Sequence, residues 1–341
     1  MFLSDLHGKF NAEYAFGNCV FLQVLLVLAK GFAFKLYFAL RGRSILKVRF
    51  IINPAAGTAG RLKQIAGLVR AVLGKENGIF EVKATNGAGS AGELAREAVV
   101  KGYEFVFACG GDGTVNAVAS QLVGTGTALG IIPAGSGNAL ARSLGIPDDP
   151  LEALRLLKTG TVRGMDVGRT CGRYFFTTAG FAFEALLSKK YNEGALTRKI
   201  RGIAPYYALG LFEYLRFTPD RVSIIVDGQE VNAAPFILTA ANTSQWGAGA
   251  FIAPGARVDD GLLDFCVLPK SGIIRTIALW RRLMKGSVNT YAGFQRIMGK
   301  DAVIKGRKAS YAHVDGEPFE CGGDISISVL PGALGVLAPT A

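Results

Sequence analysis

A short glycine-rich segment after an apolar run constrains this chain more than any other feature of its sequence. The run is Phe105 to Cys109, and the segment that follows it, Gly110 to Asn116, reads GGDGTVN. Glycines at the end of a strand let backbone N–H groups turn toward an anion, and the helix expected from Thr114 adds its positive end. Asp112 would then stand beside phosphates, which it would repel unless it binds Mg²⁺ or takes a proton. The segment therefore predicts phosphoryl transfer, with a tight turn and a capping Asp as the alternative.

A second loop of the same kind follows the next apolar run. Leu129 to Ile132 are apolar, Pro133 to Asn138 reads PAGSGN, and Ala139 to Leu144 has a helical pattern. This loop can also cradle phosphate at the start of a helix. Two such loops make an ordinary turn a weaker explanation of the first.

The first half of the chain alternates strands and helices. The expected strands are 48–52, 80–85, 105–109 and 129–132, and the helices between and after them are expected near 62–72, 90–98, 114–122 and 138–144. Ser90 and Glu93 have the spacing of a capping box. This alternation predicts a doubly wound parallel sheet with helices on both faces and ligands at the carboxyl ends of its strands.

The pattern changes after Pro147 and a helical stretch at 151–157. Short β-like runs separated by turns are expected at 166–168, 174–178, 222–226, 236–240, 262–268, 302–305 and 325–329. We therefore expect three parts: an apolar extension at 1–46, a nucleotide-binding domain at 47–163, and a mainly antiparallel β domain at 164–341.

Composition and net charge limit the classes of binding partner that are expected. The 341 residues, half of them apolar, allow two domains, and the net charge of +12 favours a nucleotide, a nucleic acid or an anionic lipid surface. A nucleic-acid partner is not expected, because no helix-turn-helix, zinc or RNP pattern occurs. The cysteines lack the spacing of zinc sites or of a disulfide framework, which predicts reduced, buried thiols in a cytosolic compartment. They are Cys19, Cys109, Cys171, Cys266 and Cys321.

Two segments could meet a membrane. Residues 19–29 are apolar but shorter than the ~20 residues of a membrane span, and residues 32–43 mix aromatic and cationic side chains, as interfacial helices do. Asp5 and Glu13 argue against a signal peptide. A surface anchor, a helix packed on the protein's own core and a wrongly assigned start codon stay open for this segment. The second segment, 189–201, is rich in cations: Lys189, Lys190, Arg198, Lys199 and Arg201.

The ordered motifs resemble a known family. GGDGTVN, PAGSGNALAR at 133–142 and VDGEP at 314–318 occur in the order found in lipid kinases related to diacylglycerol kinase and sphingosine kinase. NPAAG at 53–57 and DDGLLD at 259–264 belong to the same set. The resemblance runs from about Lys47 to the end of the chain. GGDG alone is shared with NAD kinases and phosphofructokinases, whereas the five motifs in order are much more specific.

This resemblance implies a two-domain kinase. The N-terminal α/β domain would bind the nucleotide, and a C-terminal β-sandwich would bind lipid and return its last strands toward the first domain. ATP and Mg²⁺ are the implied cofactors, and the implied acceptor is a lipid hydroxyl at an anionic membrane surface. The protein is then expected in the cytoplasm, peripherally attached to the inner face of the membrane, and a homodimer is left open.

The resemblance also assigns residues to roles. The ATP-binding residues would be Asn53, Pro54, Gly57, Thr85, Gly110, Gly111, Asp112, Gly113, Thr114, Val115, Asn116, Gly135, Ser136, Gly137 and Asn138. The VDGEP motif supplies a general base, which maps to Glu317 with Asp315 beside it. In sphingosine kinases the acid of the glycine loop has that role, so Asp112 stays a third candidate. A surface turn is the alternative for Asp315 and Glu317, and His313 is expected to be structural.

The resemblance also implies a metal loop, and two residues of this chain, Ala117 and Ala139, depart from the pattern of many relatives. The structural Mg²⁺ of the family maps to the Asp260 side chain and the carbonyls of Arg257 and Leu262, with a metal-free turn as the alternative. Ala117 stands where many relatives have Glu. Ala139 is typical of sphingoid-base kinases, but Leu186 stands where the acid for a sphingoid amine is expected. The lipid stays open, and an NAD kinase-like enzyme or a nucleotide-binding regulatory protein without turnover are the alternatives.

Overall fold

A computed structural model describes residues 45–54, 59–74, 78–87, 89–193, 203–247, 249–309 and 311–340. The chain divides into the units Met1–Ser44 and Ile45–Ala341, and the fold given below is that of the second unit. The apolar segment expected near the N-terminus, Gly57, and the cations Arg198, Lys199 and Arg201 lie outside the described residues.

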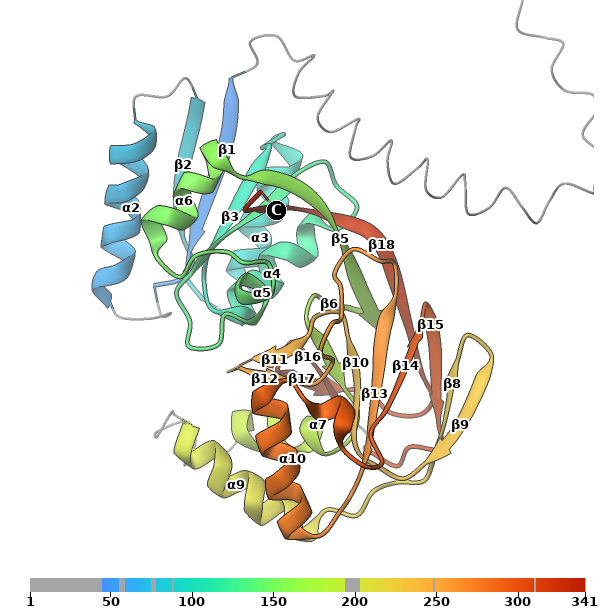
Figure 1. The fold of residues 1–341 in the computed structure, drawn as a ribbon. Coiled ribbons are helices and arrows are strands. Elements are labelled where there is room, and N and C mark those ends of the chain that lie inside the picture. Colours follow the sequence, from blue (N-terminus) through green and yellow to red (C-terminus); the bar gives the residue numbers. More distant parts are fainter. Residues whose placement is uncertain are drawn as a thin grey trace, which may run out of the picture. The chain divides into compact units, whose positions relative to one another are not determined.

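Parallel strands form the first part of the structure, as the alternation predicts. Their order is β2 (Gly78–Ala84), β1 (Leu46–Ile52), β3 (Phe105–Gly110) and β4 (Ala128–Pro133). Every residue of β3 and β4 is buried, as expected for parallel strands covered on both faces. The helices are α2 (Ala59–Leu73), α3 (Ser90–Val100), α4 (Asp112–Leu122), α5 (Ala139–Ser143) and α6 (Pro150–Thr159). In Figure 1, α2 and α6 lie in front of this sheet and α3 and α4 behind it.

The capping box predicted at Ser90 and Glu93 is wrong. The residue before α3 is Gly89, whose φ of 84° lies in the left-handed region, and no side chain caps the helix. Ser90 instead donates its hydroxyl to the carbonyl of Gly87 and accepts the N–H of Asn86. It closes the turn that precedes the helix, and glycine supplies the backbone conformation at the helix start.

One long strand joins the two halves of the fold. β18 (Ile325–Ala338) pairs in parallel with β4 through Val336 and Leu129, and along most of its length it is antiparallel to β5 (Thr161–Thr170). β15 (Asp301–Lys305), β8 (Val222–Val226) and β9 (Gln229–Ala233) continue the same ten-stranded sheet, and β6 (Arg173–Phe175) pairs with β5. The runs expected at 166–168 and 325–329 are therefore parts of longer strands. Pro331 and Gly332 lie at an irregularity between Leu330 and Leu334, where the register shifts.

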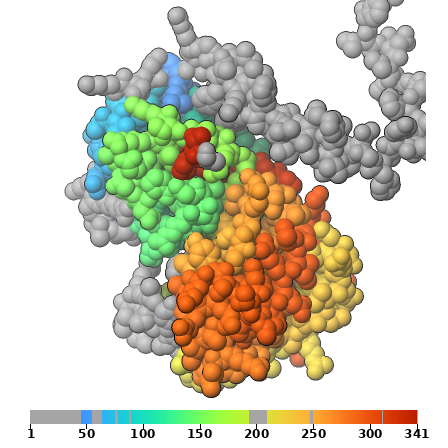
Figure 2. Space-filling view, in the orientation of Figure 1, coloured from blue at the N-terminus to red at the C-terminus, as the bar shows by residue number. Residues whose placement is uncertain are grey.

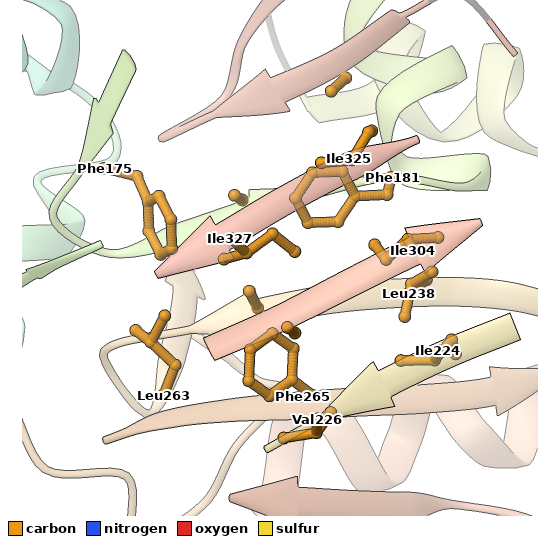
Figure 3. Packing of buried hydrophobic residues seen from close by; sticks show 14 of the residues in the cluster. Phe175, Phe181, Ile224, Val226, Leu238, Leu263, Phe265, Ile304, Ile325 and Ile327 are labelled. Atoms are coloured by element: carbon orange, nitrogen blue, oxygen red, sulfur yellow. The ribbon is translucent and has the colours of Figure 1, made fainter. Parts of the chain in front are cut away.

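A second, six-stranded antiparallel sheet packs against the C-terminal part of the first. Its order is β14 (Gln295–Gly299), β13 (Leu263–Pro269), β10 (Pro235–Ala241), β7 (Thr178–Gly180), β16 (Tyr311–Val314) and β17 (Glu317–Glu320). Buried side chains from both sheets interleave between them, among them Phe265 and Leu238 from one sheet and Ile304 and Ile327 from the other (Figure 3). The structure thus confirms an α/β domain with a parallel sheet followed by an antiparallel β domain.

Three helices of the β domain were not predicted. They are α7 (Phe183–Glu193), α9 (Ile203–Arg216) and α10 (Ile273–Lys285), which is followed by a 3₁₀ turn (Val288–Thr290). A second buried cluster packs them onto the outer face of the six-stranded sheet, together with the short pair β11 (Gln245–Gly247) and β12 (Ala250–Phe251). Figure 2 shows α10 in orange on the surface of the lower lobe. No helix among the described residues is both long enough and apolar enough to cross a membrane.

The cysteine prediction needs correction. Cys171 and Cys321 form a disulfide that closes a separation of 150 residues, although their spacing gives no sign of a framework. Cys109 and Cys266 are free and buried, and burial raises the pKa of both thiols. Scattered cysteines therefore came together through the fold, because β5 and β17 end in the same region of the molecule.

Candidate active site

The glycine-rich segment forms the entry to α4. The helix begins at Asp112, two residues earlier than predicted, and Gly111 precedes it in an extended conformation. The Val115 N–H bonds to the carbonyl of Gly111, so the N–H groups of Asp112, Gly113 and Thr114 have no acceptor within the helix. These groups and the positive end of α4 can bind an anion.

The two glycine loops pack backbone against backbone. A Cβ at Gly135 would lie 2.6 Å from the Cα of Gly111, and one at Gly110 would lie 2.6 Å from the hydroxyl of Thr114. Both contacts exclude a side chain. Asn138, at a φ of 49°, closes the second loop, since its amide both donates to and accepts from the backbone of Gly135 at 3.0 Å. The predicted loop residues therefore lie together at the carboxyl ends of β3 and β4.

Asp112 connects these loops. Its Oδ1 accepts the N–H of Ala139, the first residue of α5, at 2.7 Å, and its Oδ2 faces Gly137 so closely that a Cβ there would collide with it. Burial raises the pKa of Asp112 and the Asp315 charge raises it further, while the N–H of Ala139 lowers it. Both carboxylate oxygens of Asp112 thus lie against the second loop and the start of α5.

The end of β1 joins the same edge. Asn53 donates its side-chain amide to the hydroxyl of Thr114 at 3.0 Å and its backbone N–H to the carbonyl of Cys109. Thr85 donates its N–H to the carbonyl of Ile52. Pro54 is exposed next to Asn53, at the end of the described part of this loop. The ends of β1, β2 and β3 are held side by side where the nucleotide is predicted.

The Asp315 side chain joins α4 to the β domain by hydrogen bonds. It accepts the N–H groups of Phe176, Thr177 and Thr178, the hydroxyl of Thr177 at 2.6 Å, and the side-chain amide of Asn116 at 2.7 Å. Its own φ of 48° belongs to the tight turn between β16 and β17. With so many donors on two oxygens, the Asp315 carboxylate holds this turn against the N-terminal part of α4.

Glu317 is the acid with an unused carboxyl. A Cβ at Gly113 would lie 2.5 Å from its Oε1, so the carboxyl reaches the first turn of α4. No hydrogen bond joins it to a residue that the structure describes. The residue is exposed as a whole, but its carboxyl is partly desolvated. This burial raises the pKa of Glu317, Asp315 raises it further, and Arg173 lowers it.

A cavity of about 930 Å³ starts at Asp112 and Asp315 and extends beneath α7, α9 and α10. Asp112, Asn116, Ser136, Thr177 and Asp315 line its polar end, while Glu317 does not line it. Elsewhere the lining is mainly apolar: Phe183, Leu187, Phe236, Ile237, Ile277 and Trp280. Its volume and its mainly apolar lining suit a large, mostly apolar ligand.

The residues that build this cavity were not predicted from the sequence. Phe183, Leu187 and Tyr191 recur every four residues and all line it, a helical spacing that could have identified α7. Glu184 was not predicted either. This buried side chain accepts from Leu238 and Thr239 through Oε1, its Oε2 has no partner among the described residues, and burial raises its pKa to about 7.

His313 also lines the cavity, and its expected structural role stays a prediction. It is buried in β16, and burial lowers its pKa to about 4, so the ring is neutral near pH 7. Its Nδ1 accepts the N–H of Gly316 at 3.4 Å, and its Nε2 lies against Gly180. The ring therefore fixes the turn that carries Asp315.

The predicted metal loop lies apart from this cavity. Asp260 Oδ1 accepts the N–H of Leu262 at 3.1 Å, and Arg257 pairs with Asp259. Asp166 in β5 accepts the N–H of Gly261, which ties the loop to the long sheet. Among the described residues, no three His, Cys, Asp or Glu side chains form a metal-binding group.

Comparison with known proteins identifies the family. The diacylglycerol kinase of Mycobacterium tuberculosis (strain ATCC 25618 / H37Rv) is 31% identical over 308 residues, which cover 88% of this chain and 97% of that protein. This chain belongs to the diacylglycerol kinase family. The family model "Diacylglycerol kinase catalytic domain" matches residues 47–170 of this chain, and the model "YegS C-terminal NAD kinase beta sandwich-like domain" matches residues 179–338.

Other relatives agree with this assignment. A probable lipid kinase YegS-like protein of Pseudomonas aeruginosa (strain PAO1) is 33% identical to this chain over 261 residues. The match covers 76% of this chain and 84% of that protein. The crystal structure of a diacylglycerol kinase from Bacillus anthracis str. Sterne superposes with a TM-score of 0.65 at 20% identity and covers 87% of this chain and 98% of that one. At that identity the superposition supports the fold.

Proposed function

We propose that this lipid kinase transfers the γ-phosphate of ATP to a lipid hydroxyl at a membrane surface. One observation carries the proposal: the anion-binding start of α4 and the carboxyl groups of Asp112 and Asp315 lie at the polar end of a large apolar cavity, and the Glu317 carboxyl reaches the first turn of the same helix. Phosphate binding and lipid binding are thereby adjacent. Phosphoryl transfer requires this proximity of donor and acceptor.

The nucleotide is assigned to the edge formed by β1, β3 and β4. The phosphates would lie against the first turn of α4 and the loop Gly135–Asn138, with Asn53 and Thr85 at the ends of β1 and β2. Backbone N–H groups would provide most of the contacts, because glycines leave no side chains there. Gly57 belongs to the same proposal by its place in the sequence.

Glu317 is our candidate for the general base. Asp315 has its oxygens filled by donors, and Asp112 holds Ala139, whereas the Glu317 carboxyl reaches Gly113 without a partner among the described residues. Its raised pKa moves it toward the working pH, which favours a base. Asp315 then acts as a positioning residue, and Asp112 orders the phosphate loops.

Mg²⁺ is the proposed metal, at the loop of Asp260. The oxygen donors there suit a hard cation: Oδ2 of Asp260 makes no hydrogen bond with the described residues, and the carbonyls of Arg257 and Leu262 flank it in sequence. The Asp259 and Asp260 charges also act on Asp166, so the loop concentrates negative charge. Such an ion would stabilise the β domain, and it would lie apart from the phosphates. A second Mg²⁺ would enter with ATP and neutralise its phosphate charge.

Diacylglycerol is the first acceptor to test. Relatives are named for it, and Leu186 offers no charge for a sphingoid amine.

ATP as donor places the proposed reaction on the cytoplasmic side of the membrane. The Cys171–Cys321 disulfide is unusual for that compartment, and alkylation of the unfolded protein before and after reduction would show whether it forms in cells.

The decisive experiment is incubation with γ-labelled ATP and a panel of diacylglycerol, sphingosine, monoacylglycerol and NAD. Labelled lipid would support the proposal, labelled NADP would indicate an NAD kinase-like enzyme, and retained ATP binding without product would indicate a regulatory protein. Glu317→Gln should lower the rate of the chemical step ~10²-fold or more while ATP binding persists, with Glu320→Gln as the control on the same strand. A Glu317→Gln variant with unchanged turnover would exclude this base.

A further inference from the structure

The exposed apolar side chains of this protein gather on two helices. Eight of the twelve large apolar residues that are exposed in the described chain belong to α9 and α10. They are Leu211, Phe212 and Leu215 on α9, and Ile273, Ile274, Ile277, Trp280 and Met284 on α10. Ile274 is 80% exposed and Leu215 is 64% exposed. Single exposed apolar residues are ordinary, but a concentration of this kind marks an interaction surface.

The two helices form one surface. The hydroxyl of Tyr214 in α9 accepts a hydrogen bond from Thr276 in α10 at 2.9 Å and also bonds to the carbonyl of Ser271. Figure 1 shows α9 and α10 at the same end of the β domain, away from the parallel strands. We call the eight exposed apolar residues, together with the exposed cations Arg216, Arg275, Arg281 and Lys285, the α9–α10 surface.

α10 has two apolar faces. Leu279 and Leu283 are buried against the β domain. At 100° per residue, Ile273, Ile277 and Met284 fall within about 40° of one another on a separate face, which is exposed. A helix of a globular protein needs only one apolar face, so the second face is available to a partner.

Cations accompany this exposed face. The sequence of α10, IIRTIALWRRLMK, has four cations and no acid, and Arg275, Arg281 and Lys285 are exposed. At the end of α9, exposed Arg216 lies 5.1 Å from the ring of Phe212. Apolar side chains bordered by cations match a bilayer that has anionic headgroups above its acyl chains.

The surface also surrounds the mouth of the cavity. Leu211, Ile273, Ile277 and Trp280 are exposed to solvent and also line the cavity that begins at Asp112. A lipid that enters between α9 and α10 would keep its acyl chains in apolar surroundings throughout. A water-facing mouth would instead require the chains to cross water, at a cost that grows with each CH₂ group.

We propose that the α9–α10 surface docks on an anionic bilayer and opens the cavity directly into it. The proposal rests on the proposed lipid kinase function, since it assigns the membrane contact through which the acceptor reaches the site. It differs from the two contacts suggested by the sequence. Lys189 lies over the ring of Tyr311 and Lys190 lies near Glu213, and the apolar N-terminal segment lies outside the described residues.

The first test uses full-length protein and matched serine variants. Phe212→Ser, Leu215→Ser and Ile274→Ser together remove three exposed side chains, none of which lines the cavity. The control combines Ile79→Ser, Val100→Ser and Met298→Ser, which are exposed elsewhere. We expect the surface variant to bind vesicles of phosphatidylglycerol and phosphatidylcholine at least about tenfold more weakly, and the control to bind like the wild type.

The second test asks whether α10 itself enters the bilayer. The sequence has two tryptophans, and Trp246→Phe leaves Trp280 as the sole reporter. The indole N–H of Trp246 is buried without a partner among the described residues, so phenylalanine should be accommodated there. Lipids with brominated acyl chains should quench Trp280 fluorescence in the vesicles. Arg275→Gln with Lys285→Gln should weaken binding to anionic vesicles about tenfold or more and should leave the weaker binding to neutral ones nearly unchanged.

The outcomes separate this inference from the proposed function. If the surface variant phosphorylates monomeric dioctanoylglycerol normally but loses activity on vesicle-embedded diacylglycerol, both stand. Unchanged vesicle binding together with no quenching of Trp280 would overturn the docking surface and leave the kinase proposal intact. A wild-type protein that docks through Trp280 but phosphorylates no lipid would overturn the function alone. A change in oligomeric state for the surface variant, without a change in vesicle binding, would assign the surface to a second copy of the chain.

Discussion

Glu184 should make the stability of the β domain depend on pH. Its carboxyl is buried at the cavity wall, and burial raises its pKa from 4.5 to about 7 against the opposing effect of its hydrogen-bond donors. Oε1 accepts from three donors of the protein, and Oε2 has none among the described residues. The folded protein therefore keeps this carboxyl protonated over a range in which the unfolded chain has lost the proton.

The sign and size of the effect follow from linkage. Between about pH 4.5 and 7 the folded state binds more protons than the unfolded state, so the free energy of unfolding falls as pH rises through this range. The pKa of Glu184 differs by about 2.5 between the two states, and each pKa unit corresponds to 1.36 kcal/mol, so the free energy of unfolding should be about 3 kcal/mol lower above pH 7 than near pH 4.5. Glu184→Gln resembles the protonated side chain. It should have nearly wild-type stability near pH 4.5 and exceed it by about 3 kcal/mol at pH 8.

Urea denaturation followed by tryptophan fluorescence would measure this difference. Both tryptophans of the chain, Trp246 and Trp280, lie in the β domain, so the signal reports the part of the molecule that contains Glu184. Glu320→Gln, an exposed acid on β17, is the control and should follow the wild type at every pH. A Glu184→Gln variant that is equally destabilised at both pH values would refute the reasoning, because its cost would then come from lost hydrogen bonds.

Three further predictions concern the proposed transfer site. Asp112→Asn should lower turnover at least ~10²-fold with little change in melting temperature, as measured by steady-state kinetics and thermal unfolding, and near-normal turnover would end its assigned role. Asp315→Asn should cost about 2 kcal/mol or more of stability in urea denaturation, because one amide nitrogen would face donors; a loss of activity without a loss of stability would make it catalytic. The Gly113→Ala variant should fold normally, because only the flexible end of Glu317 must move, and it should have a lower turnover while it still binds ATP. Equal losses of turnover and ATP binding would show that the substitution disturbs the N–H groups at the start of α4 instead.

The strands of the first half could be predicted because local sequence determines them. β1, β3 and β4 contain short, mainly apolar runs, and their predicted ends differ from the observed ends by at most two residues. The capping box failed for a local reason too. Gly89 provides a left-handed backbone that no spacing rule for Ser90 anticipates.

The second half was harder to predict because its elements depend on distant partners. β18 continues through Pro331 and Gly332 since Asp166, far away in sequence, accepts the N–H of Gly332 at 2.7 Å. α10 contains Ile273, Ile274 and Ile277, whose β-branched side chains favour a strand in isolation. The disulfide between Cys171 and Cys321 likewise follows from the tertiary fold.

The candidate site shows the same division. The motifs indicated which residues to examine, and the structure brings Asp112, Asp315 and Glu317 to one locality. Their different environments could not be read from a motif, because they depend on donors from another part of the chain, such as the Asn116 amide on Asp315. The cavity was also out of reach, since helices far apart in the sequence supply its walls.

The proposed site is built across both halves of the chain, and two kinds of link keep those halves in register. β18 belongs to the β domain at Ile327 and to the parallel sheet at Val336, so one continuous strand spans the junction. The hydrogen bond from Asn116 to Asp315 joins α4 to the β16–β17 turn at the site itself. A strand resists bending more than a flexible linker does, and a partly buried hydrogen bond to a carboxylate fixes direction as well as distance. The carboxyl groups would therefore be positioned before either substrate binds. Motion on substrate binding would then be confined to the lipid entrance between α9 and α10. In the described structure, one side-chain hydrogen bond connects these two helices, from the hydroxyl of Thr276 to the hydroxyl of Tyr214.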